Sequence, residues 1–295
     1  MTPRELAERE RTGAGLGEAT LSTDRKPPPN NQLLSSLPPE VADVLQSRSE
    51  AVDLAAGTIL YEADTILGHV YFPVTAVVSL VSSLQDGAYA EVAVVGREGI
   101  VGVCAFMGGA KALSSAVVQR SGSAWRMRAC DIADLAREFE PAMQQLLRYT
   151  QALLTHMAQT SACHRHHALT QQLCRWLLQH LDRQVGDEMR ITQERIAGLL
   201  GVRREGVTGA ALQLQRAGLI HYSRGHIRVL DRRGLEQLSC ECYRVVERAY
   251  EQLRNCSPAW PHPSGAAERA SSSAGRRMDR PSSPTASERA SSAAQ

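Results

Sequence analysis

The hydrophobic pattern of the chain changes from a strand-like period to a helical one near residue 130. Before that point, short β-branched and aromatic runs recur roughly every ten residues, separated by Gly, Asp and Pro. Such runs with Gly-rich corners are typical of a β-sandwich or barrel, and favour a jelly roll. A short helix starting at Pro38-Pro39-Glu40 precedes them, and Asp86-Gly87 is a hairpin turn. The expected strands are residues 53–54, 57–61, 70–73, 76–81, 89–95, 116–119 and 123–128.

A helical pattern begins at Asp131, and Pro141 marks either a first helical turn or a junction between two helices. Beyond it, apolar residues recur at alternating spacings of three and four, which is the a/d pattern of a two-stranded coiled coil. Leu147 and Leu154 widen this stripe. The stripe either packs on the chain's own barrel or forms a dimer seam, and the length of the helix favours the seam. The predicted seam residues are Met143, Leu146, Thr150, Leu153 and Met157.

Both ends of the chain lack a hydrophobic period. Residues 1–32 are rich in Gly, Arg, Glu and Pro, and residues 257–295 are dominated by Ser, Ala, Pro and Arg. Segments that cannot bury apolar surface do not fold alone, so we expect two disordered tails. The rest divides into a β-barrel over 33–130, a helix over 131–162 and a C-terminal domain over 163–250. The expected fold class is therefore α+β.

The C-terminal domain contains a helix-turn-helix pattern within Gln193–Thr208. Ala197 lies where two helices must approach closely, and Gly201 lies at the turn, where a left-handed backbone is easiest for glycine. Val207 is placed to pack back on the first helix of the motif. Thr192 is the expected N-cap of that first helix. An ordinary helical hairpin with a Gly turn is the alternative, but the three positions together favour a DNA-binding unit.

Charge is distributed unevenly, although the whole chain carries only +2. Residues 33–150 contain 8 basic and 13 acidic residues, a net charge of −5. Residues 190–233 contain 9 arginines, no lysine and 3 acidic residues, a net charge of +6. A basic domain beside an acidic one is expected when one part alone binds nucleic acid. Within it, residues 217–230 are predicted to form a β-hairpin wing that turns at Arg224-Gly225.

The second helix of the motif begins with residue types that read DNA bases. Arginine pairs with the O6 and N7 atoms of guanine, glutamate accepts from cytosine N4, and a recognition helix presents its N-terminal residues to the bases. The predicted base-contacting residues are Arg203, Arg204, Glu205 and Thr208. The residues expected to contact phosphates are Thr192, Gln193, Ser223, Arg224 and His226.

The order of acidic barrel, long helix, helix-turn-helix and wing resembles the Crp/Fnr family of transcription regulators over about residues 33–246. The most specific segments are residues 203–208, the wing and residues 86–102. The resemblance implies a cyclic-nucleotide-binding-like sensor barrel, a dimerisation helix and a C-terminal winged helix-turn-helix. It also implies a homodimer that reads a palindromic operator in double-stranded DNA, with RNA polymerase as a candidate partner.

The same resemblance matches Arg204 and Glu205 to the family's base-reading Arg-Glu pair. The family's next base-reading arginine falls on Gly209, which is a departure. An operator read by this chain is then expected to lack the guanine preference that an arginine at position 209 would impose.

The barrel departs from relatives that bind cyclic nucleotides, in which a Gly-Glu pair holds the ribose and an arginine before Ser or Thr holds the phosphate. Here Val103 follows Gly102, and no arginine precedes Ser114 or Ser115. A buried phosphate without a cation is poorly compensated, and Lys111 is a point charge at the wrong spacing. We therefore expect no binding of cyclic AMP, and the effector is unknown.

Cysteine and histidine clusters offer weaker signals. Cys163-His164-Arg165-His166-His167, with His156, suggests a metal site, but a polar segment joining two helices is favoured. Cys240-Glu241-Cys242 suggests a redox pair, although cysteines two positions apart on a helix usually point apart. No cysteine precedes Cys104, so the N-terminal iron–sulfur cluster of Fnr-like relatives is not expected. The sequence thus predicts no metal and no cofactor.

Other functional classes find little support. The chain has no Walker loop, HExxH or GxSxG motif, so we do not expect an enzyme. No apolar run is long enough for a bilayer, the N-terminus is not a secretory signal and the seven cysteines are odd in number, which favours the cytoplasm. The rival function is a ligand-binding module that acts on a partner protein, against which the basic helix-turn-helix argues.

Overall fold

The computed structural model describes residues 20–21, 31–109 and 111–255. The predicted tail at 257–295 and most of the tail at 1–32 lie outside these residues. Two antiparallel four-stranded sheets form the N-terminal half, and seven of their strands match the segments expected from the sequence. The strands are β1 (Thr20–Leu21), β2 (Ser49–Leu54), β3 (Ile59–Tyr61), β4 (His69–Pro73), β5 (Val77–Ser83), β6 (Tyr89–Val95), β7 (Ser115–Arg120) and β8 (Gly122–Arg128).

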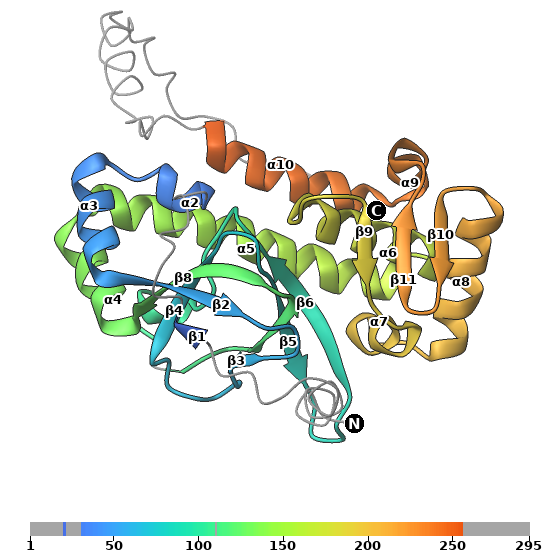
Figure 1. Ribbon diagram of the computed structural model, residues 1–295, viewed down its shortest axis with the longest axis horizontal. Coiled ribbons are helices and arrows are strands. Elements are labelled where there is room, and N and C mark those ends of the chain that lie inside the picture. Colours follow the sequence, from blue (N-terminus) through green and yellow to red (C-terminus); the bar gives the residue numbers. More distant parts are fainter. Residues whose placement is uncertain (1–19, 22–30, 110, 256–295) are drawn as a thin grey trace, which may run out of the picture. The chain divides into compact units, whose positions relative to one another are not determined.

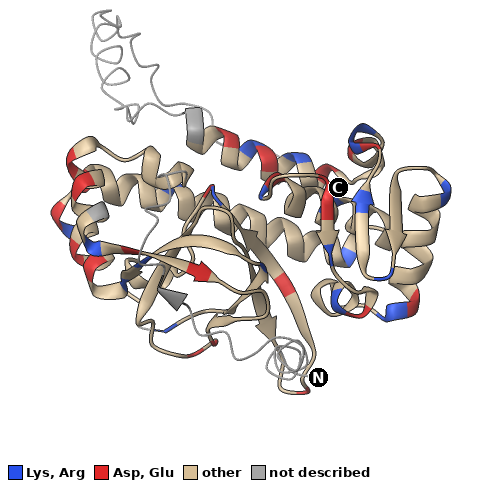
Figure 2. Ribbon diagram, viewed as in Figure 1, with Lys and Arg blue, Asp and Glu red and all other residues tan. Residues whose placement is uncertain are grey.

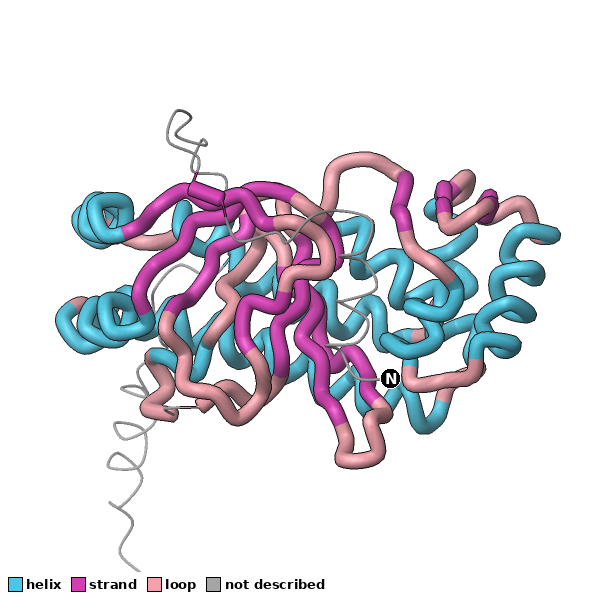
Figure 3. The backbone as a smooth tube through the Cα atoms, turned by 60° about the horizontal axis from the view of Figure 1, so that its bottom comes forward, coloured by secondary structure: helices cyan, strands magenta, loops and turns pink. Residues whose placement is uncertain are grey.

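One sheet has the order β1-β2-β8-β4 and the other has the order β3-β7-β5-β6. Figure 3 shows these strands gathered together, with helices on either side. Apolar side chains from both sheets, among them Phe72, Val78, Ala93 and Met127, are almost fully buried in one core. The predicted β-rich N-terminal domain is therefore confirmed. The short elements around it are α3 (Pro39–Arg48) and η1 (Val103–Ala105).

The chain is anchored to this sandwich by Asn31, the N-cap of α2 (Gln32–Ser35). Its buried side chain accepts a hydrogen bond from the backbone N–H of Leu34 at 3.0 Å. Its amide nitrogen donates to the carbonyl oxygens of Pro73 at 2.9 Å and Gly99 at 2.8 Å. With strand β1 paired to β2, this anchor corrects the expectation that all of residues 1–32 are disordered. Composition could not reveal it, because the partners lie far along the chain.

The helical segment after the sandwich consists of α4 (Ala129–Glu138) and α5 (Glu140–His166), which meet at Phe139. Pro141 lies in the first turn of α5, where a proline removes no helical hydrogen bond. Both expectations for this proline are thus met, because the first turn is also a junction. Helix α5 continues to His166, so the histidine-rich segment forms its last turn instead of a separate linker.

The apolar stripe of α5 faces the interior of its own chain. Leu146, Thr150 and Leu153 are 0%, 4% and 2% exposed within the single chain. The sandwich and α10 (Glu241–Asn255) cover two sides of this helix, and their apolar residues share one core with it. These three residues of the predicted seam are therefore unavailable to a partner chain.

The remaining two seam residues, Met143 and Met157, are half-buried against the same core. By contrast, Leu147 and Leu154 are 48% and 54% exposed on the solvent-facing side of α5. The exposed stripe that contains these two leucines, here called the outward stripe, is thus displaced by one residue from the predicted dimer seam.

The C-terminal half contains a helix-turn-helix and a wing (Figure 1). Strands β10, β11 and β9 form a three-stranded antiparallel sheet, and the β10–β11 turn has the left-handed residues Arg224 and Gly225, as the hairpin prediction requires. Among the described residues, no helix combines the length and apolar character of a membrane span. The elements are α6 (Leu169–Asp182), β9 (Glu188–Arg190), α7 (Gln193–Leu200), α8 (Arg204–Arg216), β10 (Ile220–Ser223), β11 (His226–Val229) and α9 (Arg232–Leu238).

Three buried cysteines, Cys163, Cys240 and Cys242, form a separate cluster where α5 ends and α10 begins. The expectation that Cys240 and Cys242 point apart is wrong. Cys240 precedes the first residue of α10, so the pair does not have the helical geometry that would separate two side chains two positions apart.

Candidate nucleic-acid interface

The turn between α7 and α8 is built as the sequence motif predicts. Thr192 caps α7, because its hydroxyl oxygen accepts a hydrogen bond from the backbone N–H of Arg195 at 3.2 Å. Gly201 ends α7 with φ +66°, in the left-handed region that favours glycine. Ala197 and Val207 are buried in the core that α6, α7, α8 and the wing share. The two helices are therefore held at a fixed angle by packing and by the turn.

The first residues of α8 project into solvent. Arg203 is its N-cap, and Arg203, Arg204 and Glu205 are all exposed. Thr208 is half-buried, and its hydroxyl lies 2.7 Å from the side-chain oxygen of Gln193 and 3.0 Å from the carbonyl oxygen of Arg204. The hydroxyl proton is thus held inside the protein, so Thr208 can offer a base only its acceptor lone pairs.

A surface hollow brings the predicted phosphate contacts beside the start of α8. Tyr222 forms one wall and donates its hydroxyl hydrogen to the carbonyl oxygen of Ile191 at 3.2 Å. Figure 2 shows Lys and Arg positions at the start of α8 and in the nearby wing. Ser223 and His226 are exposed on the two wing strands, outside the hollow. The residues lining the hollow are Thr192, Gln193, Glu194, Arg204, Tyr222, Arg224 and Gly225.

Gly209, the position that departs from the family pattern, is exposed on α8. A Cβ atom added there would meet no heavy atom within 4 Å. No contact among the described residues therefore requires glycine at this position.

The helix-turn-helix also contacts the sandwich through α7. A Cβ atom on Gly198 would lie 1.9 Å from the hydroxyl oxygen of Tyr89 on β6, so a side chain at position 198 would collide with it. Nearby, Arg195 donates to the side-chain oxygen of Gln119 on β7 at 3.2 Å. The first helix of the motif thus lies against the β3-β7-β5-β6 sheet.

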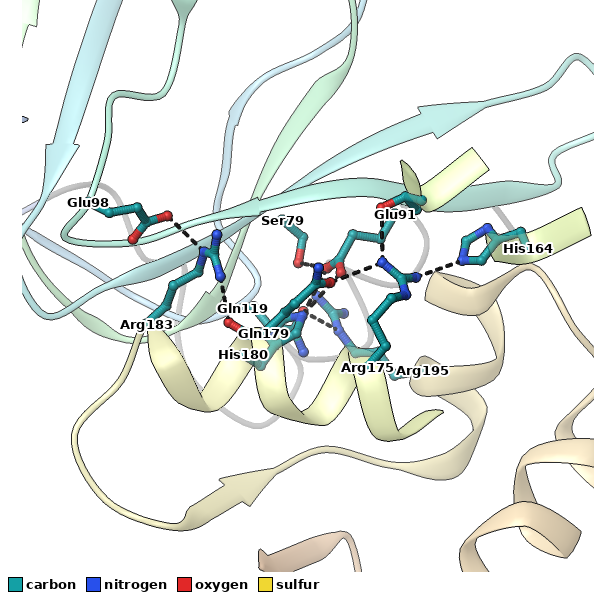
Figure 4. Close-up of polar contacts among 11 residues, drawn as sticks. Ser79, Glu91, Glu98, Gln119, His164, Arg175, Gln179, His180, Arg183 and Arg195 are labelled. Carbon is teal, nitrogen blue, oxygen red and sulfur yellow. Dashed lines mark hydrogen bonds and ion pairs between the residues drawn. The ribbon is translucent and has the colours of Figure 1, made fainter. Parts of the chain in front are cut away.

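Buried charges join the same sheet to α6 (Figure 4). The Nε2 atom of His180 lies 3.1 Å from a carboxylate oxygen of Glu91, and both side chains are at most 5% exposed. Ser79 also donates to this carboxylate. Burial opposes the ionisation of Glu91, but the charge and the hydrogen bond of His180 hold the pKa of its carboxyl below the usual range.

A second buried ion pair lies at the end of α6, where Arg183 donates to Glu98 at 2.7 Å. The Arg183 guanidinium also donates to the carbonyl oxygen of Gln179 and lies 5.1 Å from the ring centroid of Tyr250. Sequence reasoning missed these contacts. One signal was present: Glu91 lies within the apolar run of β6, where a buried acid needs a buried partner.

The described residues between Gly102 and β7 include no arginine of the kind expected to hold a cyclic phosphate. Among the described residues between β6 and β7, the only cation after Gly102 is Lys111, which pairs with Asp64 at 2.9 Å at the surface. Ser115 is buried, and its hydroxyl oxygen accepts from the backbone N–H of Ala63. A phosphate placed here would lack the buried arginine that compensates its charge, so these residues do not fit a cyclic nucleotide.

Comparisons with known families and structures agree with this architecture. Residues 51–139 match the cyclic nucleotide-binding domain, and residues 171–238 match the Crp-like helix-turn-helix domain. No curated protein sequence matches the chain.

Solved structures of similar fold cover most of the described chain. A protein assigned as a transcriptional regulator of the Crp/Fnr family in Eubacterium rectale matches with a TM-score of 0.56 and 18% identity, over 70% of this chain and 96% of its own. FixK2 from Bradyrhizobium japonicum matches with a TM-score of 0.55 and 19% identity, over 65% and 98%. A CRP-family transcriptional regulator from Thermus thermophilus gives 0.54 and 20%, over 63% and 95%. Similarity at this level of identity establishes the fold.

Proposed function

Because the chain belongs to the Crp/Fnr family of transcription regulators, we propose that it binds a specific operator in double-stranded DNA through α8 and the wing. The surface hollow carries this proposal, since it places Thr192, Gln193, Arg204 and Arg224 beside the exposed start of α8. A helix N-terminus flanked by arginines attracts the phosphate backbone while its first side chains reach the bases.

The exposed side chains divide into two roles. Arg203, Arg204 and Glu205 read base edges in the major groove, and Thr208 adds an acceptor one turn later. The five residues that bind phosphates are Thr192, Gln193, Ser223, Arg224 and His226. The acidic sandwich keeps away from the DNA, because its net charge repels the phosphates.

The active form is a homodimer that reads a palindromic operator. The outward stripe of α5, which consists of Leu147, Gln151, Leu154 and Ala158, is exposed at spacings of four, three and four. This spacing is that of a two-stranded coiled-coil seam, and two leucines in register supply its apolar contacts. The outward stripe therefore replaces the stripe of Leu146, Thr150 and Leu153 as the proposed dimer seam.

The sandwich acts as a sensor that takes no cyclic AMP or cyclic GMP. The missing acid after Gly102 and the surface pairing of Lys111 with Asp64 support this. Isothermal titration calorimetry of the full chain with either nucleotide should give no one-site isotherm at micromolar concentration. A clear one-site isotherm, or a nucleotide-dependent change in DNA affinity, would contradict this assignment.

Selection of bound sites from random double-stranded DNA tests the main proposal. We expect enrichment of a sequence with two-fold symmetry and half-sites about one helical turn apart, because a dimer presents two copies of α8. Failure to enrich any sequence, combined with weak retention on heparin, would support the alternative in which the chain binds a ligand and acts on a partner protein.

A further inference from the structure

Four potential metal ligands converge where α5 ends and α10 begins. They are Cys163, His167, Cys240 and Cys242, and their three sulfur atoms and one ring nitrogen all lie within 4.8 Å of one another. Cys163 Sγ is 3.5 Å from Cys240 Sγ, and Cys242 Sγ is 3.3 Å from His167 Nδ1. The cysteines are buried and the histidine is half-buried, so bulk water does not surround the group.

The backbone explains why these side chains meet. Cys163 and His167 are separated by one helical turn, and the His167 N–H still donates to the Cys163 carbonyl at the end of α5. Cys240 lies just before α10, and Cys242 is its second residue. Metal-bound cysteines carry negative charge, which a helix N-terminus favours.

We propose that these four residues bind one divalent cation that prefers thiolate and imidazole ligands in a tetrahedron, for which zinc is the matching ion. Zinc takes sulfur at about 2.3 Å and nitrogen at about 2.0–2.1 Å, which sets ligand atoms about 3.5–3.8 Å apart. The two observed pairs lie at 3.5 Å and 3.3 Å, so small side-chain movements complete the site. An iron–sulfur cluster spreads its cysteines over several iron atoms and needs a wider arrangement.

Two outer contacts support a metal role. The Nε2 atom of His167 lies 3.3 Å from a carboxylate oxygen of Glu241, which leaves Nδ1 to face the sulfur atoms. A carboxylate on the far nitrogen is how metal-binding histidines are usually oriented. The side-chain amide of Gln159 donates to Cys242 Sγ at 3.1 Å, as amides do to metal-bound thiolates.

The position of the site gives it a structural consequence. The Crp-like helix-turn-helix domain spans residues 171–238, and the ligand pairs lie just before and just after it. A bound ion would cross-link the end of α5 to the start of α10. It would therefore hold together the two ends of the DNA-binding domain. This inference concerns metal binding alone and holds whether or not the proposed operator is found.

Metal titration of the full chain, stripped with chelator under reducing conditions, tests the site. Cobalt(II) should bind at one equivalent per chain, with the thiolate-to-cobalt charge-transfer band and visible ligand-field bands of a tetrahedral site, and zinc should displace it. Cys240→Ser and Cys242→Ser should lose the charge-transfer band and the stoichiometric binding. Glu241→Gln should keep the spectrum but weaken zinc affinity about 10–100-fold.

Two matched controls separate a site from adventitious binding. Cys104→Ser removes a buried thiol of the sandwich, and His166→Gln removes the exposed neighbour of His167, so both should bind one equivalent like the unmodified chain. Circular dichroism shows which variants fold. If the serine variants do not fold, the cobalt stoichiometry and spectrum of the unmodified chain test the proposal.

Three results would overturn the proposal. They are a cobalt spectrum without thiolate bands, iron–sulfur absorption in the purified protein, and a Cys163–Cys240 disulfide that persists in reductant. The disulfide would require the sulfur atoms to close from 3.5 Å to about 2.05 Å. By contrast, the metal-site proposal is supported if zinc raises the unfolding midpoint of the unmodified chain but not that of Cys242→Ser.

Discussion

Arg204 and Arg224 line the same surface hollow, but they belong to elements that meet DNA differently. Arg204 is the first residue of α8, where side chains reach base edges, whereas Arg224 is at the turn of the wing. Neither guanidinium is tied to an acid by an ion pair among the described residues, so both can bind DNA without first breaking one. Their roles can therefore be separated by the sequence dependence of the loss each substitution causes.

Replacing Arg204 or Glu205 by alanine should each weaken binding to the preferred operator by roughly 1–3 kcal/mol and relax the preference at one position per half-site. Arg224→Ala should weaken binding to all sequences alike and lower the slope of log affinity against log salt by about one. Fluorescence anisotropy with operator and random duplexes measures both quantities. Equal losses for Arg204→Ala on the two duplexes would rule out a base contact.

Gly209→Arg should add selectivity for a guanine at one new position of each half-site. Position 209 lies one turn beyond Glu205 on the same face of α8, and an added Cβ atom meets no heavy atom of the described residues within 4 Å. The change should also favour the helix by up to about 1 kcal/mol, since glycine is a poor helix former. Site selection with the variant checks this. If Gly209→Arg binds no sequence at all, the glycine is needed for close approach of the backbone to DNA.

His156 makes stability depend on pH. It is 1% exposed beside Tyr250, and burial, with the charges of Arg183 and Arg175, lowers its pKa well below the usual value. The folded chain keeps this ring neutral, so the unfolded chain binds more protons below about pH 6.5. The free energy of unfolding should therefore fall on acidification, by up to about 1.4 kcal/mol per pH unit for this group.

Denaturant unfolding at pH 7.5, 6.5 and 5.5 measures that slope. His156→Gln should flatten it, whereas His221→Gln, which removes an exposed histidine of the wing, should leave it unchanged. An equally steep slope in His156→Gln would show that other groups cause the pH dependence.

At the scale of elements, helix α5 shows what a sequence pattern can and cannot decide. Its heptad-like spacing predicted a long helix with an apolar face, and the helix is present. The two candidate stripes differ by a shift of one residue, from Leu146 and Leu153 to Leu147 and Leu154. Which stripe faces inward depends on α10, which packs against α5 from about one hundred residues farther along the chain. Local periodicity carries no information about that distant partner.

Leu147→Asp combined with Leu154→Asp should convert the dimer to monomer and weaken operator binding, because two like charges would face each other in the outward stripe. Leu113→Asp is the matched control, since this leucine precedes β7 of the sandwich and is 73% exposed. Sedimentation velocity gives the oligomeric state. A double variant that remains dimeric would place the interface elsewhere.

The whole molecule shows the same limit of sequence reasoning. The strands, the turn at Gly201 and the wing at Arg224-Gly225 were all predictable, because neighbouring residues determine them. The buried pair of Glu91 and His180 spans 89 residues and could not be paired from sequence. The cysteines were seen as separate local motifs, since their meeting requires α5 and α10 to pack together.

The path of the chain through the C-terminal half has a consequence for evolution and engineering. Cys163 and Cys240 lie 77 positions apart, yet their sulfur atoms are 3.5 Å apart, so the intervening chain leaves and returns at one point. Such a segment is a cassette that can be exchanged without moving the ends of the host. Residues 168–239 of this chain could be replaced by the corresponding segment of another regulator. The chimera would bind the operator of that regulator and keep the sensor of this chain, provided that the contacts of the new segment with β6 are matched. One sensor domain can in this way be combined with different DNA-binding segments, each of which recognises its own target sequence.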